Sequence, residues 1–451
     1  MLKIISAPGR PLSGSVSLPG DKSISHRAAL FAALAEGESR IENLLVAGVT
    51  EAMLKALADL GVRWELDGNR LIVQGRGFNS WVQPPEPFFL DCGNSGTTMR
   101  LLAGALAALG LPAVLDGSPG LRRRPMNRIV APLQAMGAPI QASPDTTAPL
   151  RVEARSQDRI LDALDYTLPV ASAQVKSCLL VAALAADGPS VLREPGPSRD
   201  HSERMLRSMG VSVTSTSERS NLIPNTYYVT RLDPPRPLRL SPLNVAIPGD
   251  ISSAAFFIVA AAITPGSRVT LKDVGLNPTR TGLLDALRSM GSEIQVIQHA
   301  ERSGEPVGDI QVSYVPLQGT HISGSLVVRM IDEFPVFAIA ASCAQGQTRI
   351  SQAEELRHKE SDRISALCAE LRKLGINSIE TPDGFIINGG YMNQGGIVEA
   401  HGDHRLAMAL SVAGLVSQSP VIVDGAQVVT ESFPEFSTKL KDLGADIRVE
   451  I

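Results

Sequence analysis

The chain has 451 residues, a formal net charge of −4 and a hydrophobic content of 44%. This length allows two or three domains with ample core, and the composition is typical of a soluble globular protein. The small net charge gives no general attraction to nucleic acid or to a membrane, so we expect neither as a partner. No apolar signal core opens the sequence and no apolar run is long enough to span a bilayer, so we expect a cytoplasmic enzyme.

The predicted elements follow one pattern that recurs six times along the chain. Each copy starts with a polar segment and an Ala-rich apolar helix, and a short strand follows. A polar loop, an amphipathic helix that ends in Leu-Gly or Met-Gly, and further strands complete the copy. These endings are Leu60-Gly61, Met136-Gly137, Met209-Gly210, Met290-Gly291, Leu374-Gly375 and Leu443-Gly444. They lie about 70–85 residues apart, which is too long a period for a small solenoid repeat.

The two helices of each copy differ in character. We expect the first helices to begin near Gly20, Gly93, Ser172, Gly249, Asp332 and Gly402. They are apolar nearly all round, which predicts that they are buried. The second helices are amphipathic, and the glycine that follows each of them suits a left-handed helix cap. In the second copy we expect Pro125 at the first position of this helix. An Asp-Gly pair within residues 62–75 predicts a hairpin of strands in the first copy.

Two segments indicate that the chain consists of two homologous halves. Residues 19–37 and 248–266 both begin Pro-Gly-Asp, place serine in the first helical turn and end at glycine. Three copies of the pattern separate them. We therefore predict an α/β fold of two domains with three repeated βαβαββ-like units each, with the apolar helices inside and the sheets outside.

The domain boundaries are expected where proline and glycine concentrate. We predict one domain at residues 20–243 and a second at residues 1–19 plus 244–451. The hinges between them are expected near residues 18–20 and 241–250.

Positive charge gathers at the helix starts and in the loops before them. The cations are Lys22, Arg27, Arg124, Arg199, Lys359, Arg363 and Arg405. Free N–H groups and the dipole already make a helix N-terminus positive, so cations there are unfavourable unless an anion is present. This distribution predicts a small polyanionic ligand, such as one with two phosphate groups, although solvated charges explain any single position.

Polar and acidic residues occupy the same places. Glycines around Asn94 and Gly96 allow close backbone approach to a ligand. Glu360 lies among cations, where an acid can stay ionised or carry a proton. Arg280 is ambiguous, and the polar cap of the fourth copy is explained by structure alone. His401 and His404 have no further ligands near them in sequence, so we expect no metal.

Taken together, the motifs resemble those of the 5-enolpyruvylshikimate-3-phosphate synthase family over the whole length of the chain. They are PGDKSISHR, GNSGTTMR, RPMNR, ASAQVKS, RDHSERML, NPTRTG, IDEFPV, RHKESDR and GDHRLAM. Three of them, ASAQVKS, NPTRTG and RDHSERML, are similar to a bacterial branch that includes glyphosate-tolerant enzymes. The resemblance implies a pair of inside-out α/β barrels. It also implies a reaction that requires no cofactor and no metal. It implies transfer of the enolpyruvyl group of phosphoenolpyruvate to the 5-hydroxyl of shikimate 3-phosphate, and we expect a monomer.

The resemblance also implies roles for individual residues. The expected contacts of shikimate 3-phosphate are Lys22, Ser23, Arg27, Ser172, Ala173, Gln174, Arg199, Asp332 and Lys359. The expected contacts of phosphoenolpyruvate are Lys22, Asn94, Gly96, Arg124, Gln174, Lys359, Arg363 and Arg405. The implied catalytic residues are Lys22, Asp332, which accepts the hydroxyl proton, and Glu360, which protonates the methylene carbon. Gly96 predicts inhibition by glyphosate, whereas Glu431 stands where the enteric branch has a lysine, so a phosphate contact there is in doubt.

Two other functions compete with this interpretation. UDP-N-acetylglucosamine enolpyruvyl transferase shares the fold and the donor, but it carries a reactive cysteine in a loop before Arg-Pro. The corresponding loop here, residues 118–125, has no cysteine. A non-catalytic anion-binding protein on the same scaffold predicts loss of Asp332, Glu360 or the cations, and all of these are present.

Overall fold

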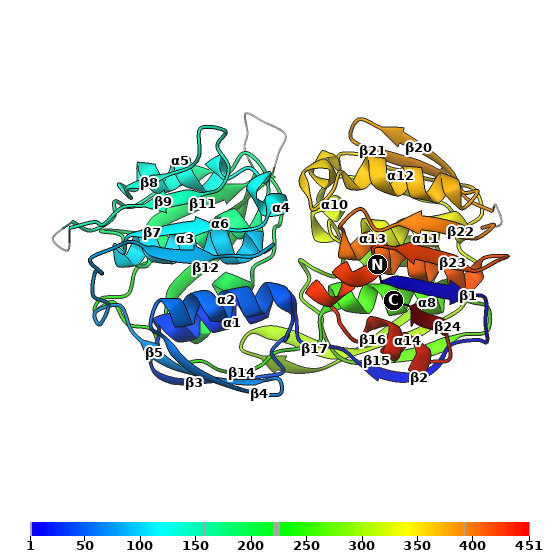
Figure 1. Ribbon diagram of the computed structural model, residues 1–451, viewed down its shortest axis with the longest axis horizontal. Coiled ribbons are helices and arrows are strands. Elements are labelled where there is room, and N and C mark those ends of the chain that lie inside the picture. The colour runs from blue at the N-terminus through cyan, green and yellow to red at the C-terminus, as the bar shows by residue number, and fades with distance from the viewer. Residues whose placement is uncertain (1, 157–158, 220–225, 391–392, 451) are drawn as a thin grey trace. The chain divides into compact units, whose positions relative to one another are not determined.

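A computed structural model describes residues 2–156, 159–219, 226–390 and 393–450 (Figure 1). The chain folds into two compact units. Unit 1 comprises residues 1–21, 248–301 and 306–451, and unit 2 comprises residues 22–247 and 302–305. Each unit mixes helices and four-stranded sheets, so the predicted α/β class is confirmed.

The apolar first helices form the interior of each unit. They are α1 (Lys22–Leu34), α3 (Gly96–Leu109) and α6 (Ala173–Ala183) in unit 2, and α8 (Ile251–Ile263), α11 (Phe334–Cys343) and α13 (His404–Ala413) in unit 1. Each begins within a few residues of its expected start. Every residue of α8 and of α13 is buried, as a helix without a polar face requires.

The amphipathic second helices end as the sequence predicts. They are α2 (Gly48–Asp59), α5 (Asn127–Ala135), α7 (His201–Ser208), α9 (Gly282–Ser289), α12 (Arg363–Lys373) and α14 (Phe436–Asp442). The glycine that follows each of them has a positive φ, from +77° at Gly375 to +106° at Gly444. Residues with a side chain rarely adopt this conformation, so the repeated glycine stops each helix at a defined place.

Within the residues that the structure describes, six four-stranded sheets accompany the helices, three in each unit. Those of unit 2, in hydrogen-bonded order, are β14 (Asn244–Ala246), β3 (Glu36–Glu42), β5 (Arg70–Arg76), β4 (Arg63–Asp67); β6 (Phe88–Asp91), β7 (Ala113–Asp116), β9 (Leu150–Val152), β8 (Ile140–Gln141); and β10 (Asp165–Thr167), β11 (Ser190–Glu194), β13 (Thr226–Asp233), β12 (Ser212–Arg219). Those of unit 1 are β22 (Gly396–Glu399), β23 (Val421–Asp424), β1 (Lys3–Ala7), β24 (Asp446–Glu450); β16 (Glu293–Arg302), β17 (Glu305–Ser313), β15 (Arg268–Gly275), β2 (Ser13–Ser17); and β18 (His321–Ile322), β19 (Gln347–Ile350), β21 (Gly384–Asn388), β20 (Asn377–Thr381). Short helical turns complete the fold: α4 (Pro119–Arg122), α10 (Ser325–Arg329), η1 (Glu354–His358), η2 (Gly414–Val416) and η3 (Ala426–Glu431).

The sheets share one pairing scheme. Each has a parallel pair at one edge, such as β6 with β7, followed by antiparallel pairing to the next strand, such as β7 with β9. The predicted hairpin of the first copy is β4–β5, in which Asp67 pairs with Arg70 across a two-residue turn. The repeat in sequence is therefore also a repeat in topology.

Strands from distant parts of the chain complete three of the sheets. Strand β2 lies parallel to β15, β14 lies parallel to β3, and β1 pairs with β23 and β24. The N-terminal strands β1 and β2 thus belong to sheets whose other strands follow residue 248. A parallel pair needs no adjacency in sequence, because its connection can be long.

Each unit has its own cluster of buried apolar side chains. In unit 2, α3 packs closely on α6 at Gly104. An added Cβ at Gly104 would lie 2.2 Å from the carbonyl oxygen of Cys178, so only glycine permits this approach. The N-termini of the buried helices lie at the border of this core. They hold the polar residues that are described next.

Candidate active site

In unit 1, Arg363 brings three acidic residues to one guanidinium. Arg363 is the first residue of α12 and its side chain is 1% exposed. Its Nη1 donates to Asp332 Oδ1 at 3.2 Å and its Nη2 to Glu360 Oε2 at 2.7 Å. Its Nε donates to Asp403 Oδ2 at 2.7 Å. Burial opposes the charge of Arg363, but the carboxylates of Asp403, Glu360 and Asp332 outweigh burial and raise its pKa.

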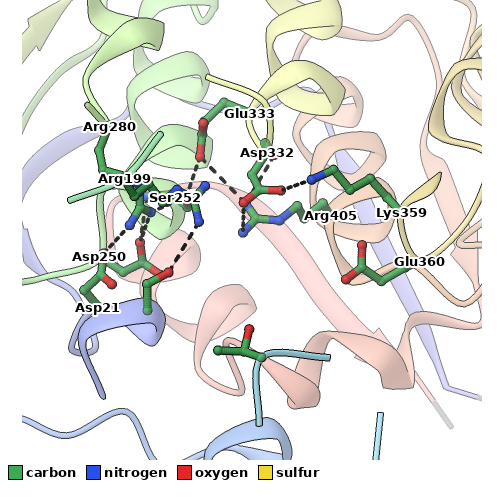
Figure 2. Close-up of polar contacts among 12 residues, drawn as sticks. Asp21, Arg199, Asp250, Ser252, Arg280, Asp332, Glu333, Lys359, Glu360 and Arg405 are labelled. Carbon is green, nitrogen blue, oxygen red and sulfur yellow. Dashed lines mark hydrogen bonds and ion pairs between the residues drawn. The ribbon is translucent and has the colours of Figure 1, made fainter. Parts of the chain in front are cut away.

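Two further cations flank Asp332, as Figure 2 shows. Lys359 Nζ lies 3.9 Å from Asp332 Oδ1, and Arg405 Nη2 lies 3.6 Å from Asp332 Oδ2. Arg405 Nη1 also donates to the main-chain oxygen of Asp332 at 3.2 Å. With Arg363, three cations lie within 4 Å of this carboxyl group, an arrangement that favours its ionised form.

The helix starts place these residues. Asp332 directly precedes Glu333, the N-cap residue of α11, and Arg405 lies in the first turn of α13. Asp403 caps α13 by accepting a hydrogen bond from the Arg405 N–H at 2.9 Å. Burial disfavours the Asp403 carboxylate, but the charge of Arg363 outweighs burial and lowers the pKa of Asp403.

In unit 2, Arg27 joins three helices. Its side chain is buried, and its Nε donates to Ser202 Oγ of α7 at 2.8 Å. Its Nη2 donates to Ser177 Oγ of α6 at 2.7 Å, and its Nη1 to the main-chain oxygen of Ser23 in its own helix at 2.8 Å. Arg199 lies beside the same helix start, because its Nη1 donates to Ser23 Oγ at 3.3 Å. The structure thus gathers Ser23, Arg27 and Arg199 at the N-terminus of α1.

A second group in unit 2 surrounds Gly96 at the start of α3. An added Cβ at Gly96 would lie 2.9 Å from Arg100 Nη1 and 3.0 Å from Arg124 Nη1, so both guanidinium groups border this glycine. Arg100 also donates to Gln174 Oε1, and Gln174 Nε2 donates to Thr97 Oγ1 at 3.0 Å. Predicted residues from the second and third copies therefore meet here.

The remaining predicted residues of unit 2 lie at helix starts as well. Ser172 caps α6 by accepting from the Val175 N–H, and Ala173 is the first residue of that helix. Lys22 is the first residue of α1. Asn94 precedes α3, and its Oδ1 accepts a hydrogen bond from Ser118 Oγ at 3.0 Å. In unit 1, Glu431 ends η3.

One local prediction is wrong, and sequence reasoning missed several residues. Pro125 was expected at the first position of a helix, but α5 begins at Asn127 with Met126 as its N-cap residue. The chain instead forms the short helix α4, in which Pro119 takes the first position. Arg100 and Asp403 were missed, although Arg100 lies four residues after Gly96 on one helix face and Asp403 has the pattern of an N-cap.

Within residues 2–156, 159–219, 226–390 and 393–450, no group of three or more His, Cys, Asp or Glu side chains could hold a metal ion. His401 instead contacts Glu370 Oε1 at 2.7 Å. None of the helices described is long and apolar enough to cross a bilayer.

Known proteins match this chain over nearly its whole length, in sequence and in fold. The family described as EPSP synthase (3-phosphoshikimate 1-carboxyvinyltransferase) matches residues 6–440. The chain is 48% identical over 441 residues to a 3-phosphoshikimate 1-carboxyvinyltransferase of Xanthomonas axonopodis pv. citri (strain 306), covering 98% of this chain and 96% of the relative. It is 47% identical to the protein of the same name from Xanthomonas campestris pv. campestris (strain 8004). A solved EPSP synthase from Acinetobacter baumannii is 39% identical and superposes with a TM-score of 0.86 over 100% of both chains.

Proposed function

The chain belongs to the EPSP synthase family, and on this basis we propose that it transfers the enolpyruvyl group of phosphoenolpyruvate to the 5-hydroxyl of shikimate 3-phosphate. The reaction releases phosphate. The observation that carries the proposal is the convergence of Asp332 and Glu360 on Arg363, with Lys359 and Arg405 beside Asp332. Two acids held by fixed cations suit proton transfer between two anionic substrates.

We assign a separate proton transfer to each acid. Asp332 accepts the proton of the 5-hydroxyl while Glu360 donates a proton to the methylene carbon of phosphoenolpyruvate. The hydroxyl oxygen bonds to the adjacent carbon, which becomes the tetrahedral ketal. Glu360 then takes a proton back from the new methyl group as the carbon–oxygen bond to phosphate breaks. The phosphate leaves with the proton that Asp332 accepted, so protons balance over the cycle.

The cations and polar groups bind the two substrates in this proposal. Shikimate 3-phosphate contacts Lys22, Ser23, Arg27, Ser172, Ala173, Gln174, Arg199, Asp332 and Lys359. Phosphoenolpyruvate contacts Lys22, Asn94, Gly96, Arg124, Gln174, Lys359, Arg363 and Arg405. Fixed positive charge offsets the repulsion between the two anions, and holding them in position removes the entropic cost of their encounter.

The activity test is direct. Purified protein given shikimate 3-phosphate and phosphoenolpyruvate is expected to release phosphate. Asp332→Asn and Glu360→Gln should each lower kcat by about 10²–10⁴-fold, the usual contribution of a positioned acid or base, while calorimetry still detects shikimate 3-phosphate binding. Glu354→Gln, at an exposed position in η1, is the matched control and should keep full activity. Phosphate release only with UDP-N-acetylglucosamine, or near-normal rates in both acid variants, would contradict the proposal.

Glyphosate is the proposed inhibitor, and Gly96 is the position that tests it. A methyl group at Gly96 would press on the guanidinium groups of Arg100 and Arg124. Gly96→Ala is therefore expected to weaken inhibition at least tenfold and to raise the KM for phosphoenolpyruvate by a smaller factor. The measurement is the inhibition constant at fixed substrate concentrations. Equal inhibition of the wild type and the variant would show that this position does not control the inhibitor.

The charge of the substrates and the source of their contacts also indicate where the protein acts and whether it needs a second subunit. Both carry several negative charges and cross a bilayer poorly, because charged groups are costly to transfer into hydrocarbon. We accordingly place the activity in the cytoplasm. Each proposed substrate contact is supplied by this chain, so a monomer is sufficient for the reaction.

A further inference from the structure

A buried arginine that sequence analysis left ambiguous joins the proposed acid site to the start of α8. Arg280 is 2% exposed. Its Nη1 donates to Asp21 Oδ2 at 2.8 Å, and its Nη2 approaches Asp250 Oδ1 at 3.1 Å and Ser252 Oγ at 2.7 Å. All four residues belong to unit 1. A buried cation with two carboxylate partners is strongly held, because loss of the cation would leave both charges uncompensated.

The contacts continue from Ser252 to the proposed substrate-binding residues. The Ser252 hydroxyl accepts from Arg280 and donates to Glu333 Oε1. Glu333 is 2% exposed, and its Oε1 lies 3.8 Å from Arg405 Nη1. In Figure 2, Glu333 has contacts to Ser252 and to the guanidinium of Arg405, which also contacts Asp332. We define these four residues, Arg280, Ser252, Glu333 and Arg405, as the relay.

Within the relay, Glu333 lies beside the guanidinium of Arg405. Arg405 Nη1 contacts both the Glu333 carboxyl group and the main-chain oxygen of Asp332, so Glu333 restrains the orientation of the guanidinium next to the proposed base. Glu333 is in turn fixed by the Ser252 hydroxyl. A hydroxyl has one hydrogen, and the bond from Arg280 to the Ser252 oxygen directs that hydrogen toward Glu333.

The side chain of Arg280 stays protonated. Burial opposes its ionisation, but Asp21, Asp250 and the acids at positions 332 and 333 outweigh burial and raise its pKa. Because an arginine side chain stays protonated and presents a rigid planar fork of donors, it can fix several acceptors at once. A lysine has the charge but not the fork.

We propose that Arg280 is a positioning residue for the reaction, which acts through Ser252 and Glu333 to orient Arg405 toward phosphoenolpyruvate beside Asp332. This proposal rests on the proposed function. According to this proposal, the fourth copy of the repeat contributes to the reaction through Arg280 and Ser252, which do not contact a substrate.

Arg280 also has a purely structural task, which the experiment must separate from the relay. It holds the segments around Asp21 and Asp250, which are further joined by hydrogen bonds from Asp21 N to Pro248 O at 2.9 Å and from Asp250 N to Pro19 O at 3.0 Å. Removing Arg280 would disturb these segments as well as the relay. Ser252→Ala instead breaks the relay and leaves both carboxylate contacts of Arg280 in place, so it is the decisive variant.

The test compares Ser252→Ala, Ser252→Thr, Arg280→Lys and the control Arg288→Gln, an exposed arginine of α9. Ser252→Ala should raise the KM for phosphoenolpyruvate about tenfold and lower kcat, with the KM for shikimate 3-phosphate within about twofold and Tm nearly unchanged. Ser252→Thr keeps the hydroxyl and should restore most of the loss. Arg280→Lys should show an intermediate loss, and Arg288→Gln none.

The outcomes separate this inference from the proposed function. A wild-type protein that releases no phosphate from the two substrates contradicts the proposed function and this inference with it. An active wild type with an unchanged KM for phosphoenolpyruvate and kcat in Ser252→Ala contradicts the inference alone. Variants that lose only thermal stability, with normal kinetic constants for the folded protein, also overturn it, because Arg280 would then serve the fold and not the reaction.

Discussion

At the scale of single residues, burial and hydrogen bonds hold two of the proposed substrate-binding cations in place. Sequence analysis placed Arg27 and Arg363 with the other cations as ligands of an anion. In the structure both are 1% exposed and are bonded to protein groups, serines and a main-chain oxygen for Arg27 and carboxylates for Arg363. Their fixed positions present a preorganised charge to the substrate anions proposed above, and such a charge stabilises a developing anion without rearrangement.

His26 provides a test of burial that does not depend on activity. It lies in α1, where Nδ1 contacts the main-chain oxygen of Lys22 at 2.7 Å and Nε2 contacts that of Val49 at 3.0 Å. Burial lowers the pKa of His26 to about 4, despite these carbonyl contacts, which favour the protonated form. The neutral imidazole is therefore the form that fits the folded protein.

The sign of the pH dependence follows from this shift. Between pH 6.5 and pH 4 the unfolded chain binds a proton at His26 and the folded protein does not, so acid favours unfolding. The contribution is fully present above pH 6.5 and is lost as the pH falls toward 4, with a size on the order of 3 kcal/mol. Urea unfolding at several pH values should show a shallower decline for His26→Gln than for the wild type. His299→Gln, at an exposed position, is the control, and an identical decline in wild type and His26→Gln would refute the burial argument.

At the scale of elements, local sequence signals predicted helix ends and turns well. The terminal glycines of the second helices, the β4–β5 hairpin and the burial of the apolar helices are all present in the structure. These features depend on φ, on turn chemistry or on periodicity within a few residues. The misplaced start of α5 arose because α4 precedes it, and a short helix of four residues leaves almost no periodic signal.

Long-range contacts were harder to infer from sequence. Nothing in the local pattern of β2 or β14 indicates that they pair with β15 and β3, because period-2 alternation does not identify a partner strand. The same holds for the site. Motifs identified the charged residues at the helix starts, but not the contact of Arg363 with Asp403 or the relay from Arg280, which join positions far apart in sequence.

At the scale of the whole molecule, the two buried clusters correspond to the two units. The cluster of unit 1 includes the residues of α8, α11 and α13, and the cluster of unit 2 includes those of α1, α3 and α6. The chain passes between the units at residues 21–22, 247–248, 301–302 and 305–306, and each unit has its own core. A domain with its own core can lose stability on its own.

Two matched substitutions test this independence. Phe337 in α11 and Phe31 in α1 are both completely buried, one in each cluster. Replacing either with alanine should cost roughly 3–5 kcal/mol, because contacts are lost and a cavity remains. In hydrogen exchange measured by mass spectrometry, Phe337→Ala should accelerate exchange in α8, α11 and α13 while leaving α1, α3 and α6 protected, and Phe31→Ala should do the reverse. Equal acceleration in both sets of helices by either variant would mean that the two cores unfold as one cooperative unit, since a local loss of packing can spread only where stability is shared.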